Sequence, residues 1–223
     1  MKKDIVSKAA SVSRKKFLYY FPKGFSDKKY FAWERGYKWD AHLAWENDLN
    51  KKEFKKLLEE KSFSEIALRA ARIETKTNLL FSFEKMALRD AIKPAEGAEA
   101  FAKGLYEYIY GKKSFKDRFE KFSEVLHSLP RKQTRVRTWP LQTVFGFIAK
   151  PAEFIFLKPQ VTKTAAKKYE YDFKYQSKPN WITYQSLLGF ADQIKKDNPD
   201  LEPKDFIDLQ SFIWVSGSEE YDD

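Results

Sequence analysis

Aromatic side chains recur at helical spacing along the first 130 residues of the chain. Tyr30, Trp33 and Tyr37 lie three or four residues apart, as do Phe115 and Phe119. Residues at this spacing share one face of an α-helix, so each run predicts an amphipathic helix with a ring-bearing face. Helix-capping residues stand ahead of several predicted helices, namely Ser26, Asn50, Ser62 and Ser114. The pattern predicts a helical body over residues 1–130.

The same rings explain how such a chain closes a core. Aromatic residues make up 17% of the 223 residues, and there is no cysteine. Each ring buries a large apolar area, so a folded core is expected without a disulfide or a structural metal. The lack of cysteine excludes disulfide frameworks, thiolate zinc sites and Cys nucleophiles. We therefore expect no cofactor and no metal centre.

The pattern changes after Pro130. Residues 153–158, EFIFLK, have the composition of a strand, and the rings of Tyr171, Phe173 and Tyr175 alternate with polar neighbours, as in a second strand. The predicted fold class is mainly α (α+β), a helical body with a small two- or three-stranded β element between residues 150 and 178. We expect a helical subdomain over residues 1–130 and an α+β subdomain over 131–223, packed together in one compact domain.

Charge is unevenly distributed along the chain. Residues 1–29 carry nine Lys or Arg against two Asp or Glu, and residues 131–178 carry eleven against three. Residues 192–223 reverse the balance, with three bases against ten acids. Blocks of one sign steer partners of the opposite charge, so the basic blocks indicate an anionic partner. Alternatively, the basic and acidic blocks neutralise one another within the fold.

The sequence also predicts a compartment. The first residues are charged and lack the apolar run of about 7–15 residues found in a signal peptide. No stretch approaches the roughly 20 apolar residues that a membrane helix needs. Together with the lack of cysteine, this predicts a cytoplasmic protein without membrane contact.

Several segments resemble parts of bacterial proteins that form an uncharacterised family. Those in the second half are TWPLQTVFGFI, IFLKPQVT, KPNWITY and DLQSFIWV, and the similarity extends to ERGYKWDAHL and TNLLFSFEKMALRDA. The resemblance implies a bacterial, cytoplasmic setting. It implies no activity.

The strongest candidate for a functional site is the basic segment after Pro130. Four cations within seven residues stand next to an indole, a combination that suits phosphate contact together with ring stacking. These residues are Arg131, Lys132, Arg135, Arg137 and Trp139, and further cations of the same block are Lys158, Lys163, Lys167 and Lys168. The leading hypothesis is a non-catalytic protein that binds DNA, RNA or another polyanion through this surface. Alternatively, the segment is a solvated connection that forms salt bridges with the acidic C-terminal block.

A second hypothesis belongs to a different class of protein. The acidic tail holds Glu219, Glu220, Asp222 and Asp223. Paired with the basic blocks of a partner or of a second copy, it would suit a protein–protein adaptor or an accessory subunit.

A third hypothesis is a metal-dependent nuclease. Glu153 and Asp172 on adjacent strands would hold Mg²⁺ while Lys174 orients a water molecule. The acid-x-Lys pattern also occurs elsewhere, for example at Glu53–Lys55, as expected for a chain with 33% charged residues. With two histidines and no cysteine, most general-base and nucleophile schemes lack their parts. The balance is therefore against catalysis.

Overall fold

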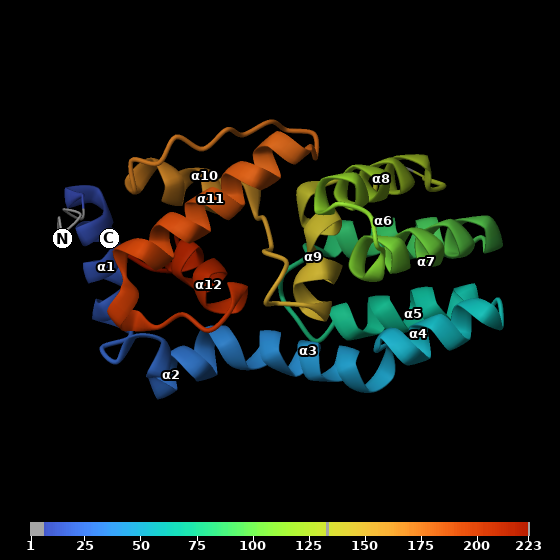
Figure 1. The fold of residues 1–223 in the computed structure, drawn as a ribbon, viewed down its shortest axis with the longest axis horizontal. Helices are drawn as coiled ribbons and strands as arrows, with labels where there is room; N and C mark the ends of the chain where they lie inside the picture. Colours follow the sequence, from blue (N-terminus) through green and yellow to red (C-terminus); the bar gives the residue numbers. More distant parts are fainter. Residues whose placement is uncertain (1–6, 133, 223) are drawn as a thin grey trace.

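The computed structural model describes residues 7–132 and 134–222, and every regular element in these ranges is a helix (Figure 1). The helices of the first half are α1 Lys8–Tyr20, α2 Lys28–Tyr30, α3 Gly36–Asp48, α4 Lys51–Glu59, α5 Phe63–Glu74, α6 Ser82–Ile92, α7 Ala95–Tyr110 and α8 Phe115–Ser128. Those of the second half are α9 Trp139–Ala149, α10 Pro159–Lys168, α11 Trp181–Asp197 and α12 Phe206–Gly217. Short 3-10 turns cover Gly24–Ser26 and Pro199–Leu201, and a π-helical turn covers Phe31–Arg35.

The helices gather into two groups with α9 between them (Figure 1). At one end α10, α11 and α12 pack together with α1, and at the other α4 to α8 pack against one another. Helix α9 contacts α3, α5, α7 and α8 and is buried along its whole length. One continuous apolar core runs through both groups. The predicted subdomain boundary near Pro130 stays a prediction.

Side-chain caps explain several helix starts. Asn50 Oδ1 accepts from the backbone N–H groups of Lys52 and Glu53, and Ser114 Oγ accepts from that of Asp117. A cap of this kind satisfies backbone donors that have no partner within the helix. The predicted starts at Asn50 and Ser114 are confirmed, whereas Ser62 makes no capping hydrogen bond.

The predicted β element is wrong. Residues 153–158 and 171–175 contain no strand, and in the second segment the N–H groups of Phe173 and Tyr175 donate to carbonyl groups only two residues earlier, both at 2.9 Å. Helix side chains take the place of a partner strand: the Tyr184 hydroxyl accepts from Ile155 N–H (3.1 Å), and Thr143 Oγ1 accepts from Leu157 N–H (3.1 Å). Likewise Ser186 Oγ accepts from Lys174 N–H at 3.0 Å. Buried backbone groups need partners of some kind, and here hydroxyls on α9 and α11 supply them.

A π-helical turn changes the face of the first aromatic run. The turn at Phe31–Arg35 inserts an extra residue into the helix and shifts the phase of the residues after it. Tyr30 is fully buried, but Trp33 is 53% exposed, so the prediction of a shared inward face is wrong at Trp33. The same shift turns Glu34 and Lys38 inward, where they meet α12.

Helices α10 and α12 approach so closely that a single methyl group is expected to disturb them. A Cβ added at Gly217 would stand 2.2 Å from the backbone oxygen of Val161. We expect Gly217→Ala to lower the free energy of unfolding by about 1–3 kcal/mol, because backbone has to move. At Gly189 an added Cβ would meet the Tyr171 hydroxyl, the end of a movable side chain. Gly189→Ala should therefore lower the free energy of unfolding by less than Gly217→Ala does, as measured by urea unfolding. Equal losses for the two variants would contradict the prediction.

Candidate functional site

A hollow of about 240 Å³ lies between the end of α8, the segment that joins α8 to α9, and the residues just before α11. We call this hollow the basic hollow. Its walls hold five basic side chains, namely His127, Arg131, Arg135, Arg137 and Lys178. The remaining lining residues are Leu126, Leu129, Val136 and Ser177.

Buried apolar anchors hold the segment in place. Leu129 is 4% exposed and Val136 is 2% exposed, so both side chains belong to the core. Val136 O accepts from Thr138 N–H at 2.8 Å, and Thr138 caps α9. Beside the buried Val136, Arg135 is exposed and Arg137 is half-buried, and both side chains line the basic hollow.

The other wall comes from the start of α11. Asn180 caps this helix by accepting from Thr183 N–H at 2.9 Å, and its side-chain amide donates to Lys178 O at 2.7 Å. The cap therefore fixes the backbone that carries Lys178. Residues more than 40 positions apart in sequence thus meet at one surface.

The charged side chains that line the basic hollow are all of one sign. No Asp or Glu lines it, and no ion pair within the described residues engages Arg131, Arg135 or Arg137. An arginine keeps its charge at all physiological pH values and presents a planar fork of donors that matches a phosphate or carboxylate group. The arrangement suits an anion with several oxygen acceptors.

Trp139 does not belong to this surface. It is 1% exposed, and its indole N–H donates to Gln176 O at 2.8 Å. A ring in that position cannot stack on a ligand, so the predicted role of Trp139 is wrong. The indole instead ties α9 to the segment that leads to Lys178.

The other cations of the predicted binding surface lie outside the basic hollow. Lys132 pairs with Asp90 at 3.4 Å, and both residues line a different hollow. Lys158 is buried and donates to Leu79 O at 2.8 Å. Lys163 lies over the Tyr175 ring, 5.0 Å from its centroid. Lys167 and Lys168 are exposed in the last turn of α10. None of these residues lines the basic hollow.

The acidic block contacts the N-terminal basic block and lines no part of the basic hollow. Arg14 forms two hydrogen bonds with Asp200, at 2.9 and 2.6 Å, and Lys16 donates to Tyr221 O at 2.8 Å. Lys2 and Lys3 lie outside the described residues. In the acidic tail Glu219, Glu220 and Asp222 are exposed, and Asp223 lies outside the described residues.

The residues of the nuclease hypothesis lie at the surface in local pairs. Glu153 accepts from Lys150 at 2.9 Å, and Asp172 pairs with its neighbour Lys174. The paired strands on which this hypothesis depended are absent from the described part of the chain. No group of three or more His, Asp or Glu side chains in that part could hold a metal ion.

A network of buried charges joins α3 to α12. Lys38 donates to Glu34 at 3.1 Å and to Ser211 at 2.8 Å, while Arg35 contacts both Asp205 and Asp208 at 2.7 Å. Burial lowers the pKa of Lys38, an effect that the charge of Glu34 opposes. These side chains are between 0% and 9% exposed, so the network is an internal contact between helices.

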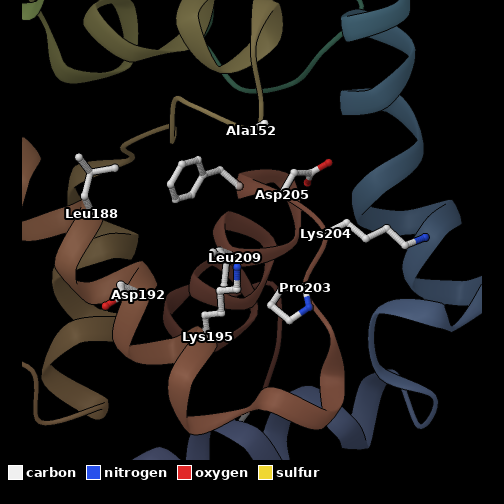
Figure 2. Close-up of a pocket in the computed structure, with 9 residues that line it drawn as sticks. Ala152, Leu188, Asp192, Lys195, Pro203, Lys204, Asp205 and Leu209 are labelled. Atoms are coloured by element: carbon white, nitrogen blue, oxygen red, sulfur yellow. The ribbon is translucent and has the colours of Figure 1, made fainter. Parts of the chain in front are cut away.

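Two other hollows differ from the basic one. The hollow of about 210 Å³ beside α11 and α12 is lined by Asp205, but Figure 2 shows this carboxylate turned away from Asp192 and Lys195. The carboxylate is bound to Arg35 instead. A third hollow of about 530 Å³ includes Glu170 as well as cations.

Two members of the basic hollow are not apparent from the sequence. Lys178 is the last residue of the basic block, more than 40 positions after the arginines, and His127 lies in the last turn of α8. Only the fold brings them to the arginines. The chain matches no family model, no curated protein and no solved structure in the comparisons. No helix in the described part is long and apolar enough to cross a membrane.

Proposed function

We propose that this protein binds a phosphate-bearing polyanion, in the first place a nucleic acid, through the basic hollow and without catalysis. One observation carries the proposal: Arg131, Arg135, Arg137 and Lys178 converge on one hollow whose walls hold no carboxylate. Neutralising phosphates releases the counterions around them, which favours binding at low salt. The cytoplasmic setting expected from the sequence fits such a ligand.

The test is a fluorescence-anisotropy titration with labelled oligonucleotides at several salt concentrations. Affinity should fall linearly on a log–log plot against salt. For the triple variant Arg131→Gln, Arg135→Gln, Arg137→Gln, we expect at least about tenfold weaker binding at low salt. The slope should fall by about 2, at roughly 0.7 for each phosphate of a single strand that is no longer neutralised.

A matched control removes the same charge elsewhere. Lys52, Lys55 and Lys56 are exposed on α4, which packs on α5 and α7 and lines no part of the basic hollow. Changing all three to Gln lowers the net charge equally and should leave most of the affinity intact. Equal loss in both triple variants would mean that net charge alone acts, and an absence of binding at low salt would refute the proposal.

A further inference from the structure

Two phenylalanine rings stand exposed where α6 begins. Phe81 is 53% exposed and Phe83 is 52% exposed, and their rings stack with centroids 5.5 Å apart and planes inclined by 19°. Met86, one turn further, is 62% exposed. We call these three residues the ring platform. Large apolar side chains gathered on a surface in this way mark a binding site more often than isolated ones do.

Buried polar groups hold the ring platform in place. Glu84 Oε2 accepts from Phe81 N–H at 3.1 Å, and Glu84 Oε1 accepts from the Thr138 hydroxyl at 3.0 Å. Burial raises the pKa of Glu84, which is 3% exposed. The Lys158 ammonium lies 3.4 Å from the centroid of the Phe81 ring. These contacts fix Phe81, on whose ring Phe83 stacks, and Glu84 links the start of α6 to Thr138, the residue that caps α9.

The ring platform borders the segment between α8 and α9, other residues of which line the basic hollow. Phe83 and Met86 line a hollow of about 350 Å³ together with Lys132 and Thr134. The direct sequence neighbours of these two loop residues, Arg131 and Arg135, line the basic hollow. The loop therefore presents cations on one side and borders exposed rings on the other.

We infer that the ring platform stacks on an unpaired base of the same ligand, so that the ligand class is single-stranded nucleic acid. This inference rests on the proposed function. A single strand offers both phosphates and free base faces, whereas a duplex hides the faces of its bases. Phenylalanine has no hydrogen-bonding group, so stacking on Phe83 selects for unpaired bases without selecting a particular sequence.

The charge around the ring platform favours a nucleic acid over a protein as its ligand. An apolar helix face also suits a partner helix, but Lys132 borders this one, and Asp90, the acid that lines the same hollow, is already paired with Lys132. The basic hollow beyond the loop adds three arginines without acidic partners among the described residues. The experiment below includes a result that would indicate a protein partner instead.

The experiment compares three ligands of equal length: oligo(dT), an abasic oligodeoxynucleotide and a DNA duplex. The abasic strand has the same phosphates without bases. Stacking of one base contributes about fivefold or more to affinity. We expect the wild type to bind oligo(dT) at least about fivefold more tightly than the abasic strand.

Variants at Phe83 separate stacking from apolar contact. Phe83→Ala and Phe83→Leu should reduce oligo(dT) affinity to that of the abasic strand, with abasic binding and the salt slope unchanged. Phe83→Trp should keep the preference for oligo(dT). Urea unfolding should show the Phe83 variants folded, since the ring is half exposed.

The contrary outcomes are distinct. If the arginine variant weakens binding while Phe83→Ala leaves the oligo(dT) preference intact, this inference fails and the proposed function stands. If no ligand binds at low salt, both fail. If Phe83→Ala converts a dimer into a monomer by light scattering without changing oligo(dT) affinity, the ring platform is a protein interface.

Discussion

Replacing Lys38 by Met is expected to lower the free energy of unfolding by about 3–5 kcal/mol. The Lys38 side chain is 1% exposed and its ammonium bonds to Glu34 and Ser211. Removing the cation leaves the Glu34 carboxylate buried, with the Tyr221 hydroxyl (2.5 Å) as its remaining donor. An unpaired buried charge is far more costly than the pair was worth.

A surface pair of the same spacing is the control for this prediction. Lys55 and Glu59 are also four residues apart, but their side chains are 65% and 67% exposed. Lys55→Met should change the free energy of unfolding by less than about 0.5 kcal/mol. Similar costs for Lys38→Met and Lys55→Met in urea unfolding would contradict the prediction.

A double-mutant cycle assigns the cost to the buried charge. Glu34→Gln removes the carboxylate that Lys38→Met leaves behind, so the double variant should be more stable than Lys38→Met alone. The coupling energy expected for contacting residues is about 0.5–3 kcal/mol. Strict additivity of the two substitutions would mean that Lys38 matters for its packing alone.

Phe119→Ala is expected to cost about 3–5 kcal/mol as well, for a different reason. The Phe119 ring is fully buried on α8 and lies against rings from α7, α9 and α11. Its ring neighbours, with centroid distances of 4.6–6.3 Å, are Tyr108, Trp139, Trp181 and Tyr184. Truncation leaves a cavity among large, rigid side chains, which have little freedom to fill it.

The control for Phe119 is the same substitution at the surface. Phe83→Ala removes an identical ring that is half exposed, so its cost should be under about 1 kcal/mol. Urea unfolding at constant denaturant slope measures both. A cost for Phe119→Ala no larger than that for Phe83→Ala would show that the junction between α8, α9 and α11 adapts to the cavity.

The two wrong predictions about local structure have different causes, a tertiary contact in one case and a change in helix geometry in the other. The alternation of rings in residues 171–175 is genuine, but a strand needs a partner, and hydroxyls of α11 fill that role. Likewise the spacing of Trp33 suits a regular α-helix, and the π-helical turn moves it to the surface. Neither event leaves a signal in short-range periodicity.

The candidate site is predictable from the sequence in part. The concentration of charge at Arg131, Arg135 and Arg137 is visible in the sequence, because the density of charge along the chain is read directly from the order of its residues. The ring beside the site is not: Trp139 is adjacent in sequence and buried, whereas Phe83 is distant in sequence and exposed beside the loop. Which face of a residue meets solvent depends on what packs over it.

The helical character of the chain, several helix starts and the place of its strongest basic segment follow from the order of its residues. These features depend on interactions within a few residues, namely side-chain caps, periodic apolar faces and clustered charge. Three further features depend on the folded chain: which cations the acidic block contacts, which cations meet in the basic hollow and which rings reach the surface. Such choices are made by contacts between residues far apart in the chain, as between Arg14 and Asp200 or Arg131 and Lys178.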